Sequence, residues 1–247
     1  MSDPIIVLND LTKKYGDYTA VDHVNLTINQ GDVFGMLGPN GAGKSTTILM
    51  MLGLTEPTSG NVEICGFNST THPIDVKRKV GYLPEDVGFY DNITGIENLR
   101  YTAQLNGIPT AKANIKIEQL LKRVGLEGQG EKKTGKYSRG MRQRLGLADV
   151  LIKDPQIIIL DEPTSGIDPA GVVEFINLIH ELSEKDGLTI LFSSHILDQV
   201  QKACQRVVLF DKGQLLAEID LAEMKEKGED LSDIYSQYFE EGGKKHE

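Results

Sequence analysis

The chain has 247 residues, of which 39% are hydrophobic and 25% charged, and its formal net charge is -10. This composition is that of a globular protein with length for a sizeable core. The acidic balance argues against a nucleic-acid binder that relies on general electrostatics. Two cysteines without metal-ligand spacing favour a reducing, cytosolic compartment. We expect no signal peptide, because the N-terminus opens with an acidic residue and a proline. We expect no transmembrane segment, because no apolar run approaches the roughly 20 residues that span a bilayer.

Strand-like segments fill the first part of the chain. Residues 5–8 and 33–37 are apolar runs, and residues 24–29 alternate apolar and polar side chains. Such alternation is typical of a half-buried antiparallel strand. Residues 61–65 and 79–83 predict two further strands, the second of which ends at a proline. These segments predict an antiparallel β subdomain near the N-terminus.

A glycine-rich phosphate loop follows the apolar strand at 33–37. Gly38–Ser45 reads G-x-x-x-x-G-K-S and precedes an apolar stretch that predicts a helix. In such a loop the backbone N–H groups and the helix N-terminus attract phosphates, and glycines let the phosphates approach. Lys44 is expected to reach the β- and γ-phosphates, and the Ser45 hydroxyl to ligate Mg²⁺. The expected nucleotide-contacting residues here are Gly38, Pro39, Asn40, Gly41, Ala42, Gly43, Lys44, Ser45 and Thr46.

Between residues 91 and 152 the hydrophobic pattern becomes that of helices. Residues 96–106 and 113–124 both show apolar positions at i, i+3 and i+4, with charged residues between them. Residues 127–136 are rich in glycine and lysine and predict a mobile loop. Another helix is predicted from residue 138 to residue 152. We interpret the whole segment as a helical insertion.

After residue 152 the sequence again predicts alternating strands and helices, as in a parallel α/β fold. The run 157–160 is fully apolar, as expected for a central strand buried on both faces. Helices are predicted at 172–182 and 196–203, and strands at 189–192, 206–210 and 214–219, the last two joined by a hairpin turn. The charged tail is predicted to be a solvated helix up to residue 239, and residues 242–247 to be disordered.

Together these elements predict an α/β fold. Its P-loop NTPase core is a mostly parallel sheet flanked by helices, with an N-terminal antiparallel β subdomain and an inserted helical subdomain. We assign 1–90 and 153–219 to the catalytic core with its β subdomain, and 91–152 to the helical subdomain. Residues 220–247 form a charged C-terminal helix and tail.

Two carboxylates directly follow the buried strand at 157–160. Asp161 and Glu162 are expected at the carboxyl edge of the sheet, where α/β proteins bind ligands. Alone they would be interpreted as a solvated strand end, but the phosphate loop favours catalysis. Asp161 can hold magnesium through water, and Glu162 can polarise the attacking water as general base.

The motif Tyr-Ser-Arg-Gly-Met-Arg-Gln-Arg at 137–144 lies just upstream of the acidic strand. With it, residues 5 to 214 resemble the ATP-binding cassette (ABC) ATPases, the nucleotide-binding subunits of ABC transporters. The family signature is usually Leu-Ser-Gly-Gly-Gln. Here Ser138 and Gly140 are kept, whereas Arg139 and Met141 differ. Without the resemblance, this motif could be only a capped helix start.

The resemblance implies how this motif works. The helix start faces the γ-phosphate of an ATP held by a second subunit, so that two ATPs are sandwiched in a head-to-tail dimer. The residues expected to make this contact across the dimer are Ser138, Arg139, Gly140 and Met141. Arg139 would add positive charge near the phosphate site.

Further site residues follow from the resemblance. Tyr15 resembles the aromatic residue that stacks on adenine, and Val21 an apolar ribose or adenine contact. Asp168 belongs to the loop that carries signals between the two sites. His195 resembles the switch histidine, which would hydrogen-bond the γ-phosphate and position Glu162 and the water. Otherwise Tyr15 would be a half-buried strand aromatic, and His195 a capping or core residue.

Glu85 stands where the family usually has glutamine, in Gly-Tyr-Leu-Pro-Glu. A carboxylate is a good ligand for a hard cation, so we expect Glu85 to bind Mg²⁺ together with Ser45 and Asp161. The expected catalytic residues are Glu162, His195 and Lys44. Glu85 and the signature variant resemble the ATPase subunits of exporters for drugs, sodium or polysaccharides.

The resemblance implies an ATP-hydrolysing transporter subunit with ATP and Mg²⁺ as cofactors. Its expected partners are a membrane-spanning subunit, through which it drives export, and a second ATPase subunit, expected to be identical. It would lie at the cytoplasmic face of the cell membrane, bound to the membrane partner, without nucleic acid. Alternatives are a soluble ABC-type clamp on nucleic acid or the ribosome, a kinase or GTPase outside the family, and a regulatory module that binds ATP without hydrolysing it.

Overall fold

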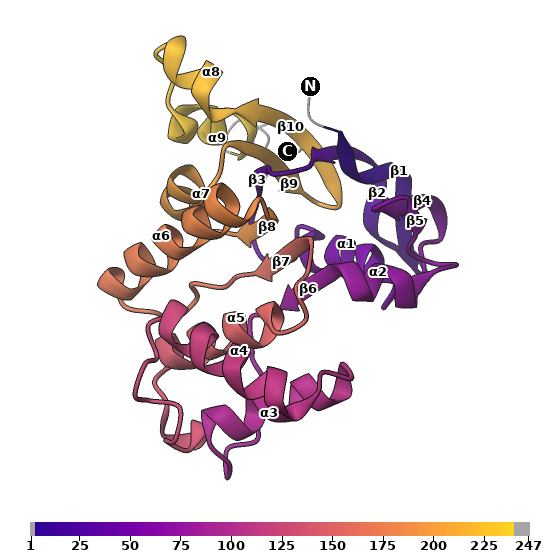
Figure 1. Ribbon diagram of the computed structural model, residues 1–247. Coiled ribbons are helices and arrows are strands. Elements are labelled where there is room, and N and C mark those ends of the chain that lie inside the picture. Colours follow the sequence, from indigo (N-terminus) through magenta and orange to yellow (C-terminus); the bar gives the residue numbers. More distant parts are fainter. Residues whose placement is uncertain (1–2, 240–247) are drawn as a thin grey trace.

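The computed structural model describes residues 3–239, which form two sheets (Figure 1). The smaller sheet is antiparallel with strand order β2-β1-β4-β5, which confirms the predicted N-terminal β subdomain. Along β1, buried apolar residues such as Ile6 and Leu8 alternate with more exposed ones, so one face of the strand is buried and the other is more exposed. The strands are β1 (Pro4–Tyr15), β2 (Tyr18–Asn29), β4 (Ser59–Ile64) and β5 (Phe67–Asn68).

The larger sheet carries the phosphate loop and the acidic strand. Its order is β10-β9-β3-β8-β7-β6, and every neighbouring pair is parallel except β10 with β9. Because parallel strands end at one edge, the segments after β3, β6, β7 and β8 meet there. The strands are β3 (Val33–Leu37), β6 (Val80–Leu83), β7 (Ile157–Asp161), β8 (Thr189–Ser194), β9 (Arg206–Asp211) and β10 (Gln214–Asp220).

Helices cover both faces of this sheet. Strand β7 is fully buried, with Ile158 and Leu160 in one apolar cluster and Ile157 and Ile159 in another, which confirms it as a central strand. The flanking helices are α1 (Lys44–Met51), α2 (Pro73–Lys79), α6 (Pro169–Asp186) and α7 (Leu197–Ala203). Helix α2 was not predicted: it is only seven residues long, with proline at its start and three basic residues in its last turn.

The predicted helical segment is α3 (Gly95–Leu105), α4 (Thr110–Arg123) and α5 (Arg139–Leu151), which lie together at the lower end of Figure 1. The predicted mobile loop needs correction at its second half. Residues 134–136 form a short 3-10 helix, and Thr134 is fully buried. Its Oγ1 donates to the carbonyl of Tyr90 at 2.9 Å, and its N–H donates to Ile93. These contacts fix the segment against the start of α3.

The C-terminal segment also differs from the predicted single solvated helix. It forms α8 (Leu221–Glu226) and α9 (Leu231–Phe239), with a break between them. Leu231 is fully buried, and Ile234, Tyr235 and Phe239 pack against the same apolar cluster. Residues 242–247 lie outside the described residues, and the assigned subdomain boundaries stay a prediction. Among the described helices, none has the length and apolar character needed to cross a membrane.

Candidate active site

The phosphate loop connects β3 to α1 and depends on two glycines for its shape. Gly43 precedes α1 with a φ of 106°, and a Cβ there would lie 2.6 Å from the carbonyl oxygen of Ala20. A Cβ at Gly38 would lie 2.1 Å from the carbonyl oxygen of Phe210. Both distances are too short for any other residue, so the loop can pass close to β2 and β9 only with glycine.

A cavity of about 390 Å³ opens beside this loop. Tyr15, which is half exposed, lines it, and the Nζ of Lys13 lies 4.9 Å from the Tyr15 ring centroid. Val21 is not among the residues that line the cavity and is fully buried next to Gly43, so its nucleotide contact stays a prediction. The cavity is lined by Tyr15, Tyr18, Ala20, Asn40, Gly41, Ala42, Gly43, Lys44, Ser45, Thr46, Glu85, Glu162 and His195.

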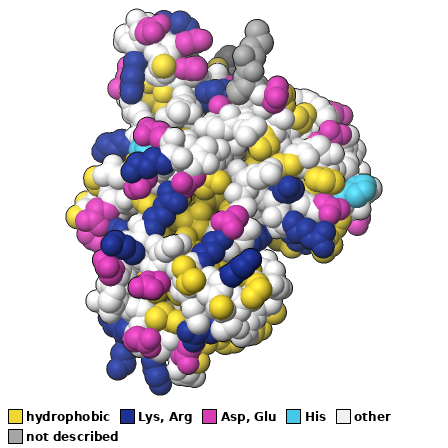
Figure 2. Space-filling model, viewed as in Figure 1, with side chains coloured by type: hydrophobic (Ala, Val, Ile, Leu, Met, Phe, Trp, Pro, Cys, Tyr) yellow, Lys and Arg dark blue, Asp and Glu magenta, His cyan; other side chains and the backbone are white. Residues whose placement is uncertain are grey.

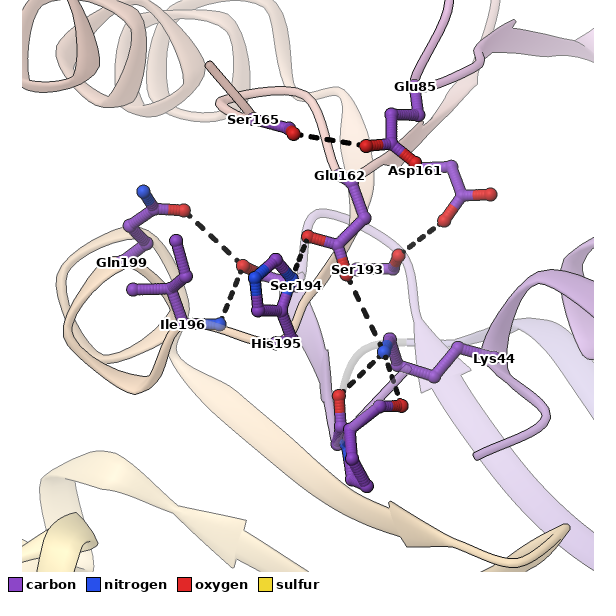
Figure 3. Close-up of polar contacts among 12 residues, drawn as sticks. Lys44, Glu85, Asp161, Glu162, Ser165, Ser193, Ser194, His195, Ile196 and Gln199 are labelled. Carbon is purple, nitrogen blue, oxygen red and sulfur yellow. Dashed lines mark hydrogen bonds and ion pairs between the residues drawn. The ribbon is translucent and has the colours of Figure 1, made fainter. Parts of the chain in front are cut away.

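Lys44 lies buried at the floor of this cavity (Figure 3). Its Nζ donates to the carbonyl oxygens of Gly38 at 2.6 Å and Pro39 at 3.2 Å, and lies 3.5 Å from Glu162 Oε1. Burial lowers the pKa of the ammonium, while the nearby Glu162 carboxylate acts in the opposite direction. A phosphate group offers Lys44 stronger acceptors than two carbonyls do.

Glu162 and His195 form a pair at the same edge. The Nδ1 of His195 lies 2.9 Å from Glu162 Oε2 (Figure 3). Glu162 is buried, and within the described part of the chain its Oε1 has no hydrogen-bond partner. The Lys44 ammonium lies 3.5 Å from Oε1, so the charge of the carboxylate is paired while this oxygen can still accept a proton.

Asp161 accepts a hydrogen bond from a buried hydroxyl. The Ser193 hydroxyl donates to Asp161 Oδ1 at 2.6 Å, and both residues are buried. Burial, and then the charge of Asp161, raise the pKa of Tyr82 to about 12, so Tyr82 remains a neutral donor beside the carboxylate. The oxygens of Ser45, Glu85 and Asp161 are of the kind that Mg²⁺ prefers. Among the residues described, no group of three or more His, Cys, Asp or Glu could hold a metal ion alone.

Buried polar residues that the sequence analysis missed support this edge. Gln199 Oε1 accepts from the hydroxyls of Thr164 at 2.5 Å and Ser194 at 3.3 Å. The Ser194 hydroxyl in turn accepts the N–H of Ile196 at 3.1 Å. Gln199 therefore joins the segment after β7 to the segment after β8, on either side of the Glu162–His195 pair. The only signal in the sequence was the polar run at the end of the apolar strand β8.

The predicted signature and coupling residues lie at helix starts outside the cavity of their own chain. Ser138 caps α5, accepting the N–H of Met141 at 3.3 Å, and Asp168 caps α6, accepting the N–H of Gly171 at 3.3 Å. The guanidinium of Arg139 is directed to other loops of the same chain, not to the phosphate loop.

Comparison with known protein families places this geometry in context. The model of the ABC transporter family matches residues 21–165. The bacitracin transport ATP-binding protein BcrA of Bacillus licheniformis is 45% identical over 223 residues, which are 90% of this chain and 72% of that protein. The ABC transporter ATP-binding protein NatA of Bacillus subtilis is 38% identical, over 94% of this chain and 96% of that protein.

Solved structures show the same fold. The structure of cbiO1 from Clostridium perfringens, part of the ABC transporter complex cbiONQ, matches with a TM-score of 0.84 and 28% identity. The match covers 92% of this chain and 93% of that one. A dimeric ATP-binding cassette in a post-hydrolysis state, bound to ADP and Pi, matches with a TM-score of 0.80 and 25% identity, over 88% and 99% of the two chains.

Proposed function

This chain belongs to the ABC transporter family as an ATP-binding subunit with ATPase activity, and from this premise we propose that it drives export through a separate membrane-spanning subunit. The observation that carries the proposed ATP-driven mechanism is the Glu162–His195 pair beside Lys44, in a cavity bounded by the phosphate loop. The family membership rules out the alternative of a kinase or GTPase outside the family. A module that only binds ATP would need neither a buried carboxylate nor its histidine partner at this position.

In the proposed mechanism the chain's own residues bind and orient the substrate. Lys44 exchanges its carbonyl contacts for the β- and γ-phosphates, and the N–H groups of the loop bind the remaining phosphate oxygens. Glu162 Oε1, which accepts no hydrogen bond from the described residues, accepts a proton from the attacking water. His195 holds Glu162 through Oε2 and hydrogen-bonds the γ-phosphate with its other ring nitrogen. Tyr15 stacks on the adenine.

Ser45, Glu85 and Asp161 are the residues we propose for Mg²⁺. When bound, the ion neutralises charge on the β- and γ-phosphates. Asp161 is suited to hold it through water, because the Ser193 hydroxyl already orients this carboxylate. Ser45 and Glu85 both line the cavity.

The signature residues are proposed to act, through the N–H groups at the start of α5, on the ATP of a second, identical subunit. Ser138, Arg139, Gly140 and Met141 belong to the start of α5, which lies outside the cavity of its own chain. A helix start with free N–H groups is suited to bind a phosphate presented by another chain. The solved dimer of a similar cassette supports this arrangement. Asp168 would link the two sites.

Export is proposed from the relatives. The similar protein BcrA is named for bacitracin transport, and the 39% identical YbhF of Escherichia coli is named as a probable multidrug ABC transporter protein. We therefore propose a small hydrophobic or peptide-like cargo that leaves the cell. The chain would sit at the cytoplasmic face of the membrane, held there by its partner.

The proposal is tested by trapping Glu162→Gln with ATP in its native membranes, solubilising gently and identifying the proteins that copurify. We expect a multi-spanning membrane protein in a fixed stoichiometric ratio. Lys44→Ala, which should not bind ATP productively, is the matched control. Copurification of only a soluble protein or RNA would contradict the transport proposal and favour the clamp on nucleic acid or the ribosome.

A further inference from the structure

We propose that Arg139 is a positioning residue that joins the start of α5 to two loops of the same chain. These are the Glu85 loop (residues 84–90) and the Ser165 turn (residues 162–167). All three guanidinium nitrogens donate: Nη1 to Asp86 Oδ1 at 2.7 Å, Nη2 to the Glu85 carbonyl at 2.9 Å, and Nε to the Ser165 carbonyl at 3.2 Å. In these contacts the guanidinium binds groups of its own chain, whereas the sequence analysis expected it to add positive charge near a phosphate.

The two loops that Arg139 joins are also connected to each other and to the active site. The Ser165 hydroxyl donates to Glu85 Oε1 at 3.0 Å (Figure 3), and the Ser165 N–H donates to the Glu162 carbonyl at 3.1 Å. From α5, Gln143 Nε2 donates to the Glu85 carbonyl at 2.8 Å. Arg139 therefore closes a ring of contacts that runs from α5 through the Glu85 loop to the turn that carries Glu162.

The contacts with the backbone, not the ion pair, carry this role. The Asp86 side chain is 89% exposed, so its ion pair with Arg139 contributes little. The carbonyls of Glu85 and Ser165 both accept from the guanidinium, and hydrogen bonds from a charged donor are stronger than those between neutral groups. Only the planar guanidinium can reach these separate acceptors at once, because a lysine ammonium is a single point charge.

The stem of Arg139 packs along the Ser165 turn. Gly166 has a φ of 71°, and a Cβ built there would lie 3.7 Å from Arg139 Cγ. A Cβ at Gly140, the next residue of α5, would lie 3.6 Å from the Ile167 side chain. The start of α5 and the Ser165 turn therefore contact each other along several residues, and the hydrogen bonds of Arg139 hold the two segments in this arrangement.

A consequence follows for turnover, and this part rests on the proposed function. If the start of α5 binds the ATP of the second subunit, a displacement of α5 is passed through Arg139 to the turn after Glu162 in the same chain. Occupancy of one site then affects the geometry of the other. The contacts of Arg139 within the nucleotide-free chain do not depend on the proposed function.

Hydrogen exchange in the absence of nucleotide tests the link directly. The reporters are the N–H groups of Ser165 and Ile167, which donate to Glu162 and Thr164 within the turn. In Arg139→Lys we expect exchange of a peptide covering 163–168 to be about tenfold faster, the effect of losing one charge-assisted hydrogen bond. Arg139→Gln should behave alike. Melting temperatures near that of the parent protein confirm that both variants fold.

Two controls separate the backbone contacts from charge. Asp86→Asn keeps both carbonyl contacts and should change exchange by less than about twofold. Arg78→Lys is the matched substitution on α2, where Arg78 pairs with Asp75 at the surface, and should leave hydrogen exchange in the Ser165 turn unchanged.

In ATPase assays Arg139→Lys should lower kcat several-fold while KM for ATP changes by less than about twofold.

Unchanged exchange in Arg139→Lys and Arg139→Gln would overturn the proposal, most clearly if ATP-dependent dimerisation were lost at the same time. That combination would assign the Arg139 side chain, and not only its backbone N–H, to the phosphate of the second subunit. Because the exchange is measured without nucleotide, a failure of the proposed transport function would leave its result interpretable.

Discussion

Glu162 has a left-handed backbone conformation, with a φ of 47°, at the end of a fully buried strand. A residue with a Cβ rarely adopts this conformation, and such strain concentrates at functional sites where the surroundings fix it. Here the Glu162 N–H donates to the Ser193 carbonyl at 3.1 Å, and the Glu162 carbonyl accepts from Ser165. This conformation turns the side chain away from the strand direction, toward His195 and Lys44.

Removal of His195 tests whether it orients Glu162. In His195→Ala the carboxylate loses its partner at Oε2, so we expect kcat to fall by about a hundredfold. Binding of ATP to the isolated chain should change little, because Lys44 and the phosphate loop remain. The measurement is steady-state ATPase activity together with nucleotide titration.

His72→Ala is the matched control for this prediction. His72 is exposed at the start of α2 and contacts only the Thr71 hydroxyl among hydrogen-bond partners described for its side chain. Its removal should leave kcat unchanged. Near-parental turnover in His195→Ala would contradict the assigned role.

Glu85→Gln is expected to keep ATPase activity within about tenfold of the parent. The glutamine amide oxygen can still accept from the Ser165 hydroxyl, and the backbone carbonyl at position 85 still accepts from Arg139 and Gln143. Glu85→Ala, which removes the side-chain acceptor, should lower activity further. A loss beyond tenfold in Glu85→Gln would show that the carboxylate charge itself is needed.

At the scale of elements, the helices and strands with a clear hydrophobic pattern were predicted from the sequence, and the shortest ones were not. The apolar run at β7 and the 3.6-residue periodicity of α3 and α4 come from burial, and these elements are where they were expected. Helix α2 and strand β5 were missed because seven- and two-residue elements carry too little periodicity. Their formation depends on neighbours that are distant in sequence.

For the site, residues within one motif were easier to predict than links between motifs. Lys44, Glu162 and His195 come together because β3, β7 and β8 are adjacent in the sheet. Strand order is not visible in a local pattern, so the link through Gln199 could not be predicted. The burial of Val21 could not be predicted for a related reason: side chains alternate along a strand, and this one faces the core.

Helix α9 provides a test of how the tail packs. Leu231 is fully buried against the cluster that includes α7. We expect Leu231→Ala to lower the free energy of unfolding by about 2–5 kcal/mol, through lost transfer energy and a residual cavity. Urea denaturation measures this change. Ile115→Ala, at a 62% exposed position on α4, is the control and should cost below about 1 kcal/mol. Equal effects would mean that α9 is only loosely attached.

At the scale of the whole molecule, surface charge is mixed. Figure 2 shows basic and acidic side chains interspersed on the face that it presents, without a continuous basic band. The net charge of the chain is -10, and the expectation that general electrostatics do not recruit nucleic acid stays a prediction. The active-site cavity is lined on one side by the phosphate loop, and the start of α5 lies outside it. On our account, the complete site needs two chains.

The most direct test of this account is the association state of Glu162→Gln with and without ATP, measured by gel filtration with light scattering. With Lys44 and the phosphate loop intact and the general base removed, ATP should bind without turnover and accumulate a dimer of about 54 kDa, twice the 27.2 kDa chain. Without nucleotide, or in the double variant with Lys44→Ala, the protein should be monomeric. A Glu162→Gln protein that binds ATP and yet remains monomeric would contradict the two-chain site.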